Sequence, residues 1–125
     1  MRRMSIGAVA ALAAAGAAGI GSAQAGGGAA TALRVKADPG GGLSFTKERL
    51  RAEPGRVTIT MKNPGASGKP HAVAIKGNGV DKDGAVAQPG GRSKVSARLS
   101  AGRYTFYCPV DGHEAGGMKG RLIVG

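Results

Sequence analysis

Residues 102–125 read GRYTFYCPVDGHEAGGMKGRLIVG, and they contain two strand-like runs joined by a glycine-rich loop. In the first run, Tyr104, Phe106 and Cys108 fall on alternate positions, and the apolar residues of the final run alternate in the same way. Alternation of this kind is typical of a strand that has one face on a core and the other in solvent. The segment therefore predicts two short strands, with Cys108 on the buried face of the first.

The same alternation recurs upstream. Its clearest example is Arg56–Asn63 (RVTITMKN), where Val57, Ile59 and Met61 share one face. Further strand-like runs, bounded by Gly and Pro turns, are Thr31–Ala37, Leu43–Glu53, His71–Lys76 and Ser93–Ser100. The later part of the second of these also fits a short helical turn. Residues 77–92 are rich in Gly, Asp and Gln, so we expect little regular structure there. About seven or eight short strands without a convincing helix indicate an all-β fold, an antiparallel sandwich or barrel.

The first residues have the composition of an export signal. Arg2 and Arg3 precede an uncharged Ala/Gly-rich run that ends in the tripeptide AQA at 23–25, a pattern that signal peptidases accept. An uncleaved membrane anchor is the alternative, because no charged residue occurs between positions 5 and 33. The arginine pair leaves both Sec and twin-arginine export open. We expect a protein that is exported to the periplasm or the extracellular space.

The chain of 125 residues is long enough for one small domain. We divide it into an export signal at 1–25, a Gly/Ala linker at 26–30 and a folded domain at 31–125. Removing the signal takes away two of the 18 basic residues and none of the 7 acidic ones, so the domain is strongly basic. Such a charge favours acidic proteins or anionic membrane surfaces as partners.

Nucleic acid fits the same charge less well. The basic residues are spread along the chain, and only 2 Tyr and 2 Phe could stack on bases. We therefore expect no nucleic-acid partner and interpret the basic side chains as the solvated faces of strands. We also expect the protein to be a monomer. The basic residues include Arg34, Lys36, Lys47, Arg49, Arg51, Arg56, Lys62, Lys76, Lys94, Arg98 and Arg121.

Metal-binding side chains gather on the C-terminal loop. Cys108, His113 and Met118 follow one another there with 4 residues between successive members. The other histidine, His71, shares a predicted strand face with Val73. As the only cysteine of an exported chain, Cys108 has no internal disulfide partner. A thiolate, two imidazoles and a weak axial thioether suit an electron-transfer copper site. The sequence therefore predicts that these residues bind one copper ion, with His71 and Cys108 pointing toward the core.

Each of these residue types also has an ordinary structural role: a cysteine or methionine often fills a core, and a histidine beside a turn is often solvated. Because all of these residues fit one metal-binding pattern, we favour a copper site over separate structural roles. Zinc would use the cysteine and histidines, but methionine is a poor zinc ligand. A cysteine–histidine hydrolase would need a polar group to orient the histidine, and a substrate cleft is hard to fit into so small a sandwich.

On these residues the chain resembles the cupredoxins, the small blue copper proteins. Its end, G-R-Y-T-F-Y-C-x4-H-E-A-G-G-M-K-G-R-L-I-V, is similar to a plastocyanin ligand loop and final strand, and Pro70-His71 is similar to the first ligand region. The resemblance covers residues 31–125 and implies a Greek-key β-sandwich with copper near one end. It also implies that the His113 edge is the docking and electron-exit surface. The implied ligands are His71, Cys108 and His113 around the metal and Met118 on its axis.

The chain departs from the plastocyanin pattern in two places. Four residues separate Cys108 from His113, a longer spacing that resembles rusticyanin-type members. Ala72 stands where many members carry an asparagine that ties the ligand loops together. Asn63 or a backbone amide is the candidate to replace that tie.

The resemblance implies a one-electron carrier that is not an enzyme. The predicted export signal indicates that it works outside the cytoplasm, and the positive charge suggests an acidic redox protein as its partner. The alternative is a protein that stores, delivers or buffers copper without relaying electrons. Trafficking proteins often carry Met- or His-rich tracts, whereas Met1 and Met4 fall in the predicted signal and Met61 lies on a core face. A multicopper oxidase or nitrite reductase would need further histidines, and both histidines of the chain are already used.

Overall fold

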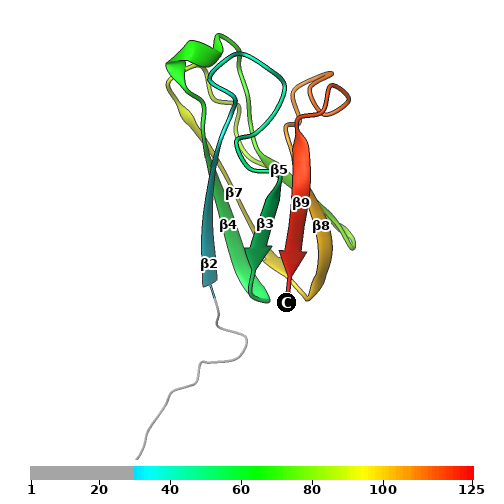
Figure 1. The fold of residues 1–125 in the computed structure, drawn as a ribbon. Helices are drawn as coiled ribbons and strands as arrows, with labels where there is room; N and C mark the ends of the chain where they lie inside the picture. Colours follow the sequence, from blue (N-terminus) through cyan, green and yellow to red (C-terminus); the bar gives the residue numbers. More distant parts are fainter. Residues whose placement is uncertain (1–29) are drawn as a thin grey trace, which may run out of the picture.

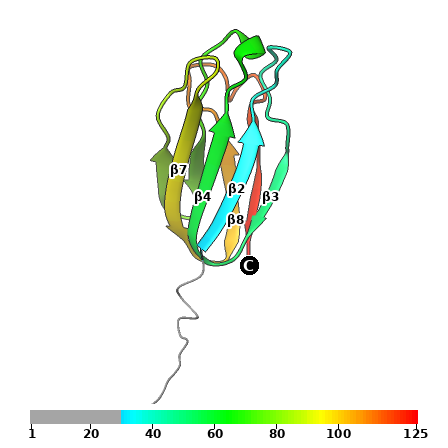
Figure 2. The same cartoon turned by 90° about the vertical axis from the view of Figure 1, so that its left-hand side faces the viewer.

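The computed structural model describes residues 30–125, which form a sandwich of two β-sheets (Figures 1 and 2). The predicted export signal and most of the predicted linker lie outside the described residues. No helix in the described range is both long and apolar enough to cross a membrane. The strands are β2 (Ala30–Lys36), β3 (Arg49–Ala52), β4 (Gly55–Lys62), β5 (Ala74–Gly77), β6 (Val80–Asp83), β7 (Arg92–Leu99), β8 (Gly102–Tyr107) and β9 (Lys119–Val124).

One sheet has three strands in the order β2-β4-β7. Its central strand, β4, places Val57, Ile59 and Met61 at 0 % exposure, as the alternation predicts, while the residues between them face outward. Because β4 is hydrogen-bonded on both sides, these β-branched and long apolar side chains are fixed against the second sheet. Figure 2 shows this layer in front, with β2 and β7 flanking β4.

The second sheet has five strands in the order β3-β9-β8-β5-β6. Phe106 of β8 lies at its centre with no exposed surface, and its ring centre lies 5.3 Å from that of Phe45. The inward faces of the two sheets form one hydrophobic core, which continues to one end of the sandwich and includes Cys108 and Met118. The all-β Greek-key sandwich of seven or eight strands is thereby confirmed.

The prediction of purely antiparallel pairing is wrong, because both sheets are mixed. Strand β2 pairs with β4 in parallel, and β3 pairs with β9 in parallel. Between β2 and β4 the chain crosses to the other sheet to form β3 and then returns, so β2 and β4 run in the same direction (Figure 2). Period-two alternation reports which face of a strand is buried and carries no information about its direction.

Residues 77–92 are more regular than expected, since they contain the short edge strand β6, which pairs with β5. The turn between these strands is Asn78-Gly79, and both residues have positive φ, 49° and 82°. Asn-Gly is the preferred pair for a two-residue hairpin turn, because both central residues need this left-handed conformation. Strand β5 itself begins only at Ala74, and His71 makes an isolated bridge to Ala87 instead of opening the strand.

Candidate metal centre

The candidate ligands meet at the end of the sandwich where β4 and β8 finish and β9 begins (top of Figure 1). Cys108 directly follows β8, and Met118 directly precedes β9. The amide of Cys108 donates to the Met118 carbonyl at 3.0 Å, and the amide of Met118 donates to the His113 carbonyl at 3.0 Å. The hydrogen bonds of the β8–β9 ladder therefore continue into the loop and close it.

Three donor atoms converge on one point. The Nδ1 atoms of His71 and His113 lie 3.2 Å apart, and Sγ of Cys108 lies 3.9 Å from the first and 3.5 Å from the second. A circle through three atoms at these separations has a radius of about 2.1 Å, which falls within the roughly 2.0–2.3 Å of metal–imidazole and metal–thiolate bonds known from zinc sites. The triangle therefore has the size that a single transition-metal ion requires.

The chemistry of the donors also suits a metal. His71 and Cys108 are completely buried, whereas His113 is partly exposed. Burial lowers the pKa of His71, and Coulomb interactions with His113 and Lys69 lower it further, which favours the neutral ring that offers a lone pair to a metal. Two imidazoles and one thiolate form the ligand set that copper favours.

Hydrogen bonds from the chain hold two of these donors in place. The backbone amide of Ala72 points at Sγ of Cys108 from 3.4 Å and so stabilises negative charge on sulfur. His71 is fixed through its backbone, because its amide donates to the Ala87 carbonyl at 3.0 Å and its carbonyl accepts from the Ala87 amide at 2.7 Å. The Nε2 atom of His71 is buried and has no hydrogen-bond partner among the described residues.

Asn63 ties together the segments around His71. Its buried side chain donates from Nδ2 to the carbonyls of Lys69 and Ala87 at 2.7 and 2.9 Å, and its Oδ1 accepts from the Ser67 hydroxyl at 2.6 Å. Lys69 precedes the His71 segment, and Ala87 is the bridge partner of His71. Of the two candidates for the missing tie between the ligand loops, the Ala72 amide reaches Cys108, whereas the Asn63 side chain binds segments on the His71 side.

Met118, the predicted axial ligand, is fully buried in the core at the end of the loop. Its backbone is fixed by the two hydrogen bonds to Cys108 and His113 described above. A buried thioether at the same end of the sandwich as a thiolate and two imidazoles completes the donor types that the sequence predicted there.

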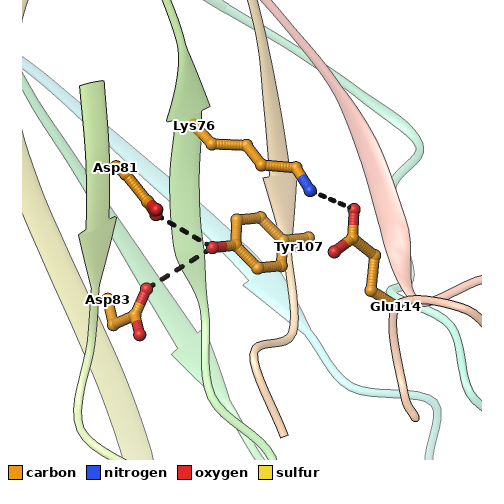
Figure 3. Close-up of polar contacts among 5 residues, drawn as sticks. All are labelled: Lys76, Asp81, Asp83, Tyr107 and Glu114. Atoms are coloured by element: carbon orange, nitrogen blue, oxygen red, sulfur yellow. Dashed lines mark hydrogen bonds and ion pairs between the residues drawn. The ribbon is translucent and has the colours of Figure 1, made fainter. Parts of the chain in front are cut away.

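The sequence did not predict a polar cluster that joins β5 and β6 to residues next to two of the ligands (Figure 3). Lys76 forms an ion pair with Glu114, with Nζ and Oε2 2.6 Å apart, and its ammonium lies 4.5 Å from the centre of the Tyr107 ring. The Tyr107 hydroxyl donates to Asp81 at 3.1 Å and also lies 3.5 Å from Asp83. Glu114 follows His113 and Tyr107 precedes Cys108, so adjacency to a ligand was the only sequence signal for these residues.

The environment of Tyr107 changes its acidity. Burial raises the pKa of Tyr107 to about 12, and the hydrogen bond and negative charge of Asp81 act in the same direction. The phenol therefore remains protonated and keeps its hydrogen bond to Asp81 across the physiological range of pH.

Solved structures share this architecture. Auracyanin B matches with a TM-score of 0.67 and 22 % identity over 76 % of this chain and 88 % of its own. Auracyanin A, a "blue" copper protein from Chloroflexus aurantiacus, matches with a TM-score of 0.61 and 20 % identity over 78 % of this chain and all of its own. A mutant of amicyanin in its Cu(I) form matches with a TM-score of 0.53 and 18 % identity over 75 % of this chain and 82 % of its own. At these identities the likeness concerns the fold.

No curated protein matches the sequence of this chain. The profile of the copper-binding proteins of the plastocyanin/azurin family, however, matches residues 31–125, the whole of the predicted domain. This match confirms the resemblance to cupredoxins and agrees with the convergence of two imidazoles and a thiolate. The chain therefore belongs to the plastocyanin/azurin family of copper-binding proteins, and its cofactor is one copper ion.

Proposed function

We propose that this protein is a type 1 (blue) copper protein that carries single electrons between redox partners outside the cytoplasm. The observation that supports this most is the triangle of Nδ1, Nδ1 and Sγ atoms, whose sides measure 3.2, 3.5 and 3.9 Å. In this proposal His71, Cys108 and His113 would hold the ion, and Met118 would add a weak thioether ligand. Bound copper supplies the Cu(II)/Cu(I) couple.

The protein's contribution is to keep the ligands in one arrangement in both oxidation states. His71 and Cys108 are buried and held by backbone hydrogen bonds, so neither side chain has room to follow the different geometries that the two states prefer. The Ala72 amide supports the thiolate, and the surrounding core excludes water. An electron can then enter or leave with little rearrangement of the protein.

His113 is the proposed point of electron exchange. Among the three converging residues it alone is partly exposed, and it lies on the loop at the end of the sandwich. Its loop neighbours Pro109 and Val110 are half-buried, and Ala115 and Gly116 are exposed, so part of the surface beside the ring carries small and apolar side chains. A partner can approach such a surface closely, because little water has to be displaced from charged groups.

The partner is proposed to be an acidic redox protein, since the domain is strongly basic, and the predicted export signal supports an encounter in the periplasm or outside the cell. An anionic membrane surface is a second candidate for association. Association with the partner should slow as salt is added, because opposite charges steer the encounter at low ionic strength.

The competing function is copper storage or delivery, which would use similar ligands. Cyclic voltammetry of the copper-loaded protein, followed by metal analysis, separates the two. We expect rapid, reversible one-electron reduction with copper retained in both states. Loss of copper on reduction would contradict electron carriage and favour delivery.

A further inference from the structure

The basic residues, although spread along the sequence, gather on the outer face of the β2-β4-β7 sheet. The register aligns Lys36 of β2 with Lys62 of β4, and Lys62 with Arg92 of β7, so three cations lie side by side across the sheet. Two residues further along the strands, Arg34 and Lys94 flank Thr60. Because side chains alternate between the two faces of a strand, cations that are far apart in the sequence lie together on one surface.

Part of this face forms a groove of about 590 Å³. Thr46 and Lys47 complete it from beyond the edge of β2, where the Thr46 amide donates to the Lys36 carbonyl at 2.8 Å and the Lys36 amide donates to the Thr46 hydroxyl at 3.1 Å. This wall of the groove is therefore tied to the sheet by hydrogen bonds. The lining of the groove consists of Arg34, Val35, Lys36, Thr46, Lys47, Thr60, Lys62 and Arg92.

The charges in the groove have no internal counterpart. No acidic residue lines it, and the ion pair found within residues 30–125 joins Lys76 of β5 to Glu114 on the loop that carries His113. Like charges placed directly opposite each other destabilise a sheet. The row formed by Lys36, Lys62 and Arg92 therefore works against folding, and a bound anion would relieve its repulsion.

We propose that this groove, which we call the cationic groove, binds an acidic polypeptide segment of the redox partner. The assignment rests on the proposed docking of an acidic redox protein. In an extended segment, carboxylates on alternate residues recur about every 6.6 Å, the spacing of alternate residues such as Arg34 and Lys36 along β2, while neighbouring strands lie roughly 4.8 Å apart. A segment lying along β2 can thus meet Arg34 and Lys36 with acidic side chains on alternate residues, with Lys62 on the neighbouring strand beside it.

Other anionic partners match the groove less well. A flat bilayer would contact cations on a concave surface less closely than a chain that lies in the groove, and the groove presents no exposed large apolar side chain for insertion. Nucleic acid would need aromatic side chains for stacking, yet Phe45, Tyr104, Phe106 and Tyr107 are all buried. A single small anion would fill little of this volume and would leave most of the cations unpaired.

The position of the cationic groove relates it to the copper site. Lys62 directly precedes Asn63, whose side chain holds the segments around His71, and Arg92 follows Gly91, whose carbonyl accepts from the Asn63 amide at 2.9 Å. The groove therefore lies at the copper-site end of its sheet. His113 lies on the loop of the opposite sheet, so a segment in the groove leaves the exposed edge of His113 free for the body of the partner.

The test measures binding of a fluorescently labelled oligoglutamate peptide to the copper-loaded protein by anisotropy at low and at physiological salt. The groove variant carries Lys36→Gln, Lys62→Gln and Arg92→Gln. The matched control carries Arg49→Gln, Arg51→Gln and Arg121→Gln, three exposed cations of the other sheet, and so has the same net charge. Visible absorption and reduction potential are recorded for all three proteins. Vesicles containing anionic lipid are tested in parallel.

We expect at least about a tenfold loss of peptide affinity in the groove variant and a change of less than about twofold in the control, because close, unscreened charges dominate such binding. Equal losses in both variants would show that net charge alone attracts the peptide and would overturn the proposal. Vesicle binding that depends on the groove, without peptide binding, would overturn it in favour of a membrane surface. Peptide binding does not require copper chemistry. A colourless copper-loaded protein would therefore refute the proposed function, whereas the peptide affinities alone would test the cationic groove.

Discussion

Lys76 and Glu114 form an ion pair of 2.6 Å that joins β5 to the loop carrying His113. We expect Lys76→Met to lower the reduction potential and Glu114→Gln to raise it. Removing a positive charge near the copper favours the oxidised ion, and removing a negative charge favours the reduced one. The free energy of unfolding should fall by no more than about 1 kcal/mol in each variant, because the pair is partly exposed to solvent.

Cyclic voltammetry of the two single variants and the double variant checks this prediction. The double variant should have a potential close to that of the wild type, because the two opposite charge effects cancel. If both single variants shifted the potential in the same direction, the pair would act by holding the ligand loop in place, and the electrostatic account would be wrong.

Asn63→Ala should weaken the copper site without touching a ligand. The substitution removes three hydrogen bonds, two of them buried, and leaves the carbonyls of Lys69 and Ala87 without this donor. We expect a loss of about 2 kcal/mol in the free energy of unfolding. We also expect copper affinity to fall by roughly 10- to 100-fold, as is usual when partners of metal ligands are removed.

Chemical denaturation of the copper-free protein and competition with a copper chelator measure these two effects. Asn78→Ala, in the β5–β6 turn, is the matched control, since its Nδ2 donates only to the Arg103 carbonyl, at 3.1 Å. The control should leave copper affinity unchanged. Unchanged affinity in Asn63→Ala as well would show that the tie does not support the site.

Tyr107 should make the protein less stable at high pH. Its pKa is about 12 in the folded state and 10.0 ordinarily, so between these values the folded protein retains a proton that the unfolded chain loses. The contribution of Tyr107 to the free energy of unfolding is fully present below pH 10 and decreases as the pH rises toward 12. Tyr107→Phe should remove this part of the pH dependence. It should also cost about 1–2 kcal/mol at neutral pH through the lost bond to a carboxylate.

Urea unfolding of the copper-free wild type and Tyr107→Phe at several pH values provides the measurement. The difference between the two proteins isolates Tyr107 from the lysines that titrate in the same range. Asp81→Asn should make the slope shallower, because it removes the charge that holds the phenolic proton. A slope that is the same in wild type and Tyr107→Phe would contradict this role of Tyr107.

Lys62→Glu should stabilise the protein, because it replaces the middle cation of the row between Lys36 and Arg92 by an opposite charge. Each new cross-strand pair is worth roughly 0.2–1 kcal/mol, so we expect a gain of about 1 kcal/mol that shrinks at high salt. Lys94→Glu is the control, since its partner across the sheet is the neutral Thr60. Thermal unfolding at low and high salt compares the two, and an equal gain in both would remove the case for repulsion within the row.

The local sequence pattern predicted which face of each strand is buried and which residues supply the metal-binding atoms. Val57, Ile59 and Met61 are buried as their alternation predicts, because side chains on a pleated strand must alternate whatever it pairs with. The convergence of His71 and Cys108 followed from the same rule, although His71 lies in an isolated bridge rather than a full strand.

Pairing and long-range contacts were not predictable in this way. Nothing in the sequence of β2 shows that it runs parallel to β4, and the ion pair of Lys76 with Glu114 joins residues that only the folded chain brings together. The β5–β6 hairpin is different, because Asn78-Gly79 is a strong turn signal that the weak apolar pattern of Val80–Asp83 obscured. The alternation also showed that the basic residues of these strands face solvent. That they lie side by side in the cationic groove could be seen only from the register of the three strands.

The proposed electron carriage depends most on a copper ion bound by the thiolate of Cys108. The visible absorption spectrum of the oxidised, copper-loaded protein tests this directly, with Cys108→Ser as its partner. We predict an intense blue colour from thiolate-to-copper charge transfer in the wild type and its complete loss in the variant. A colourless wild-type copper complex, or a blue Cys108→Ser variant, would contradict it.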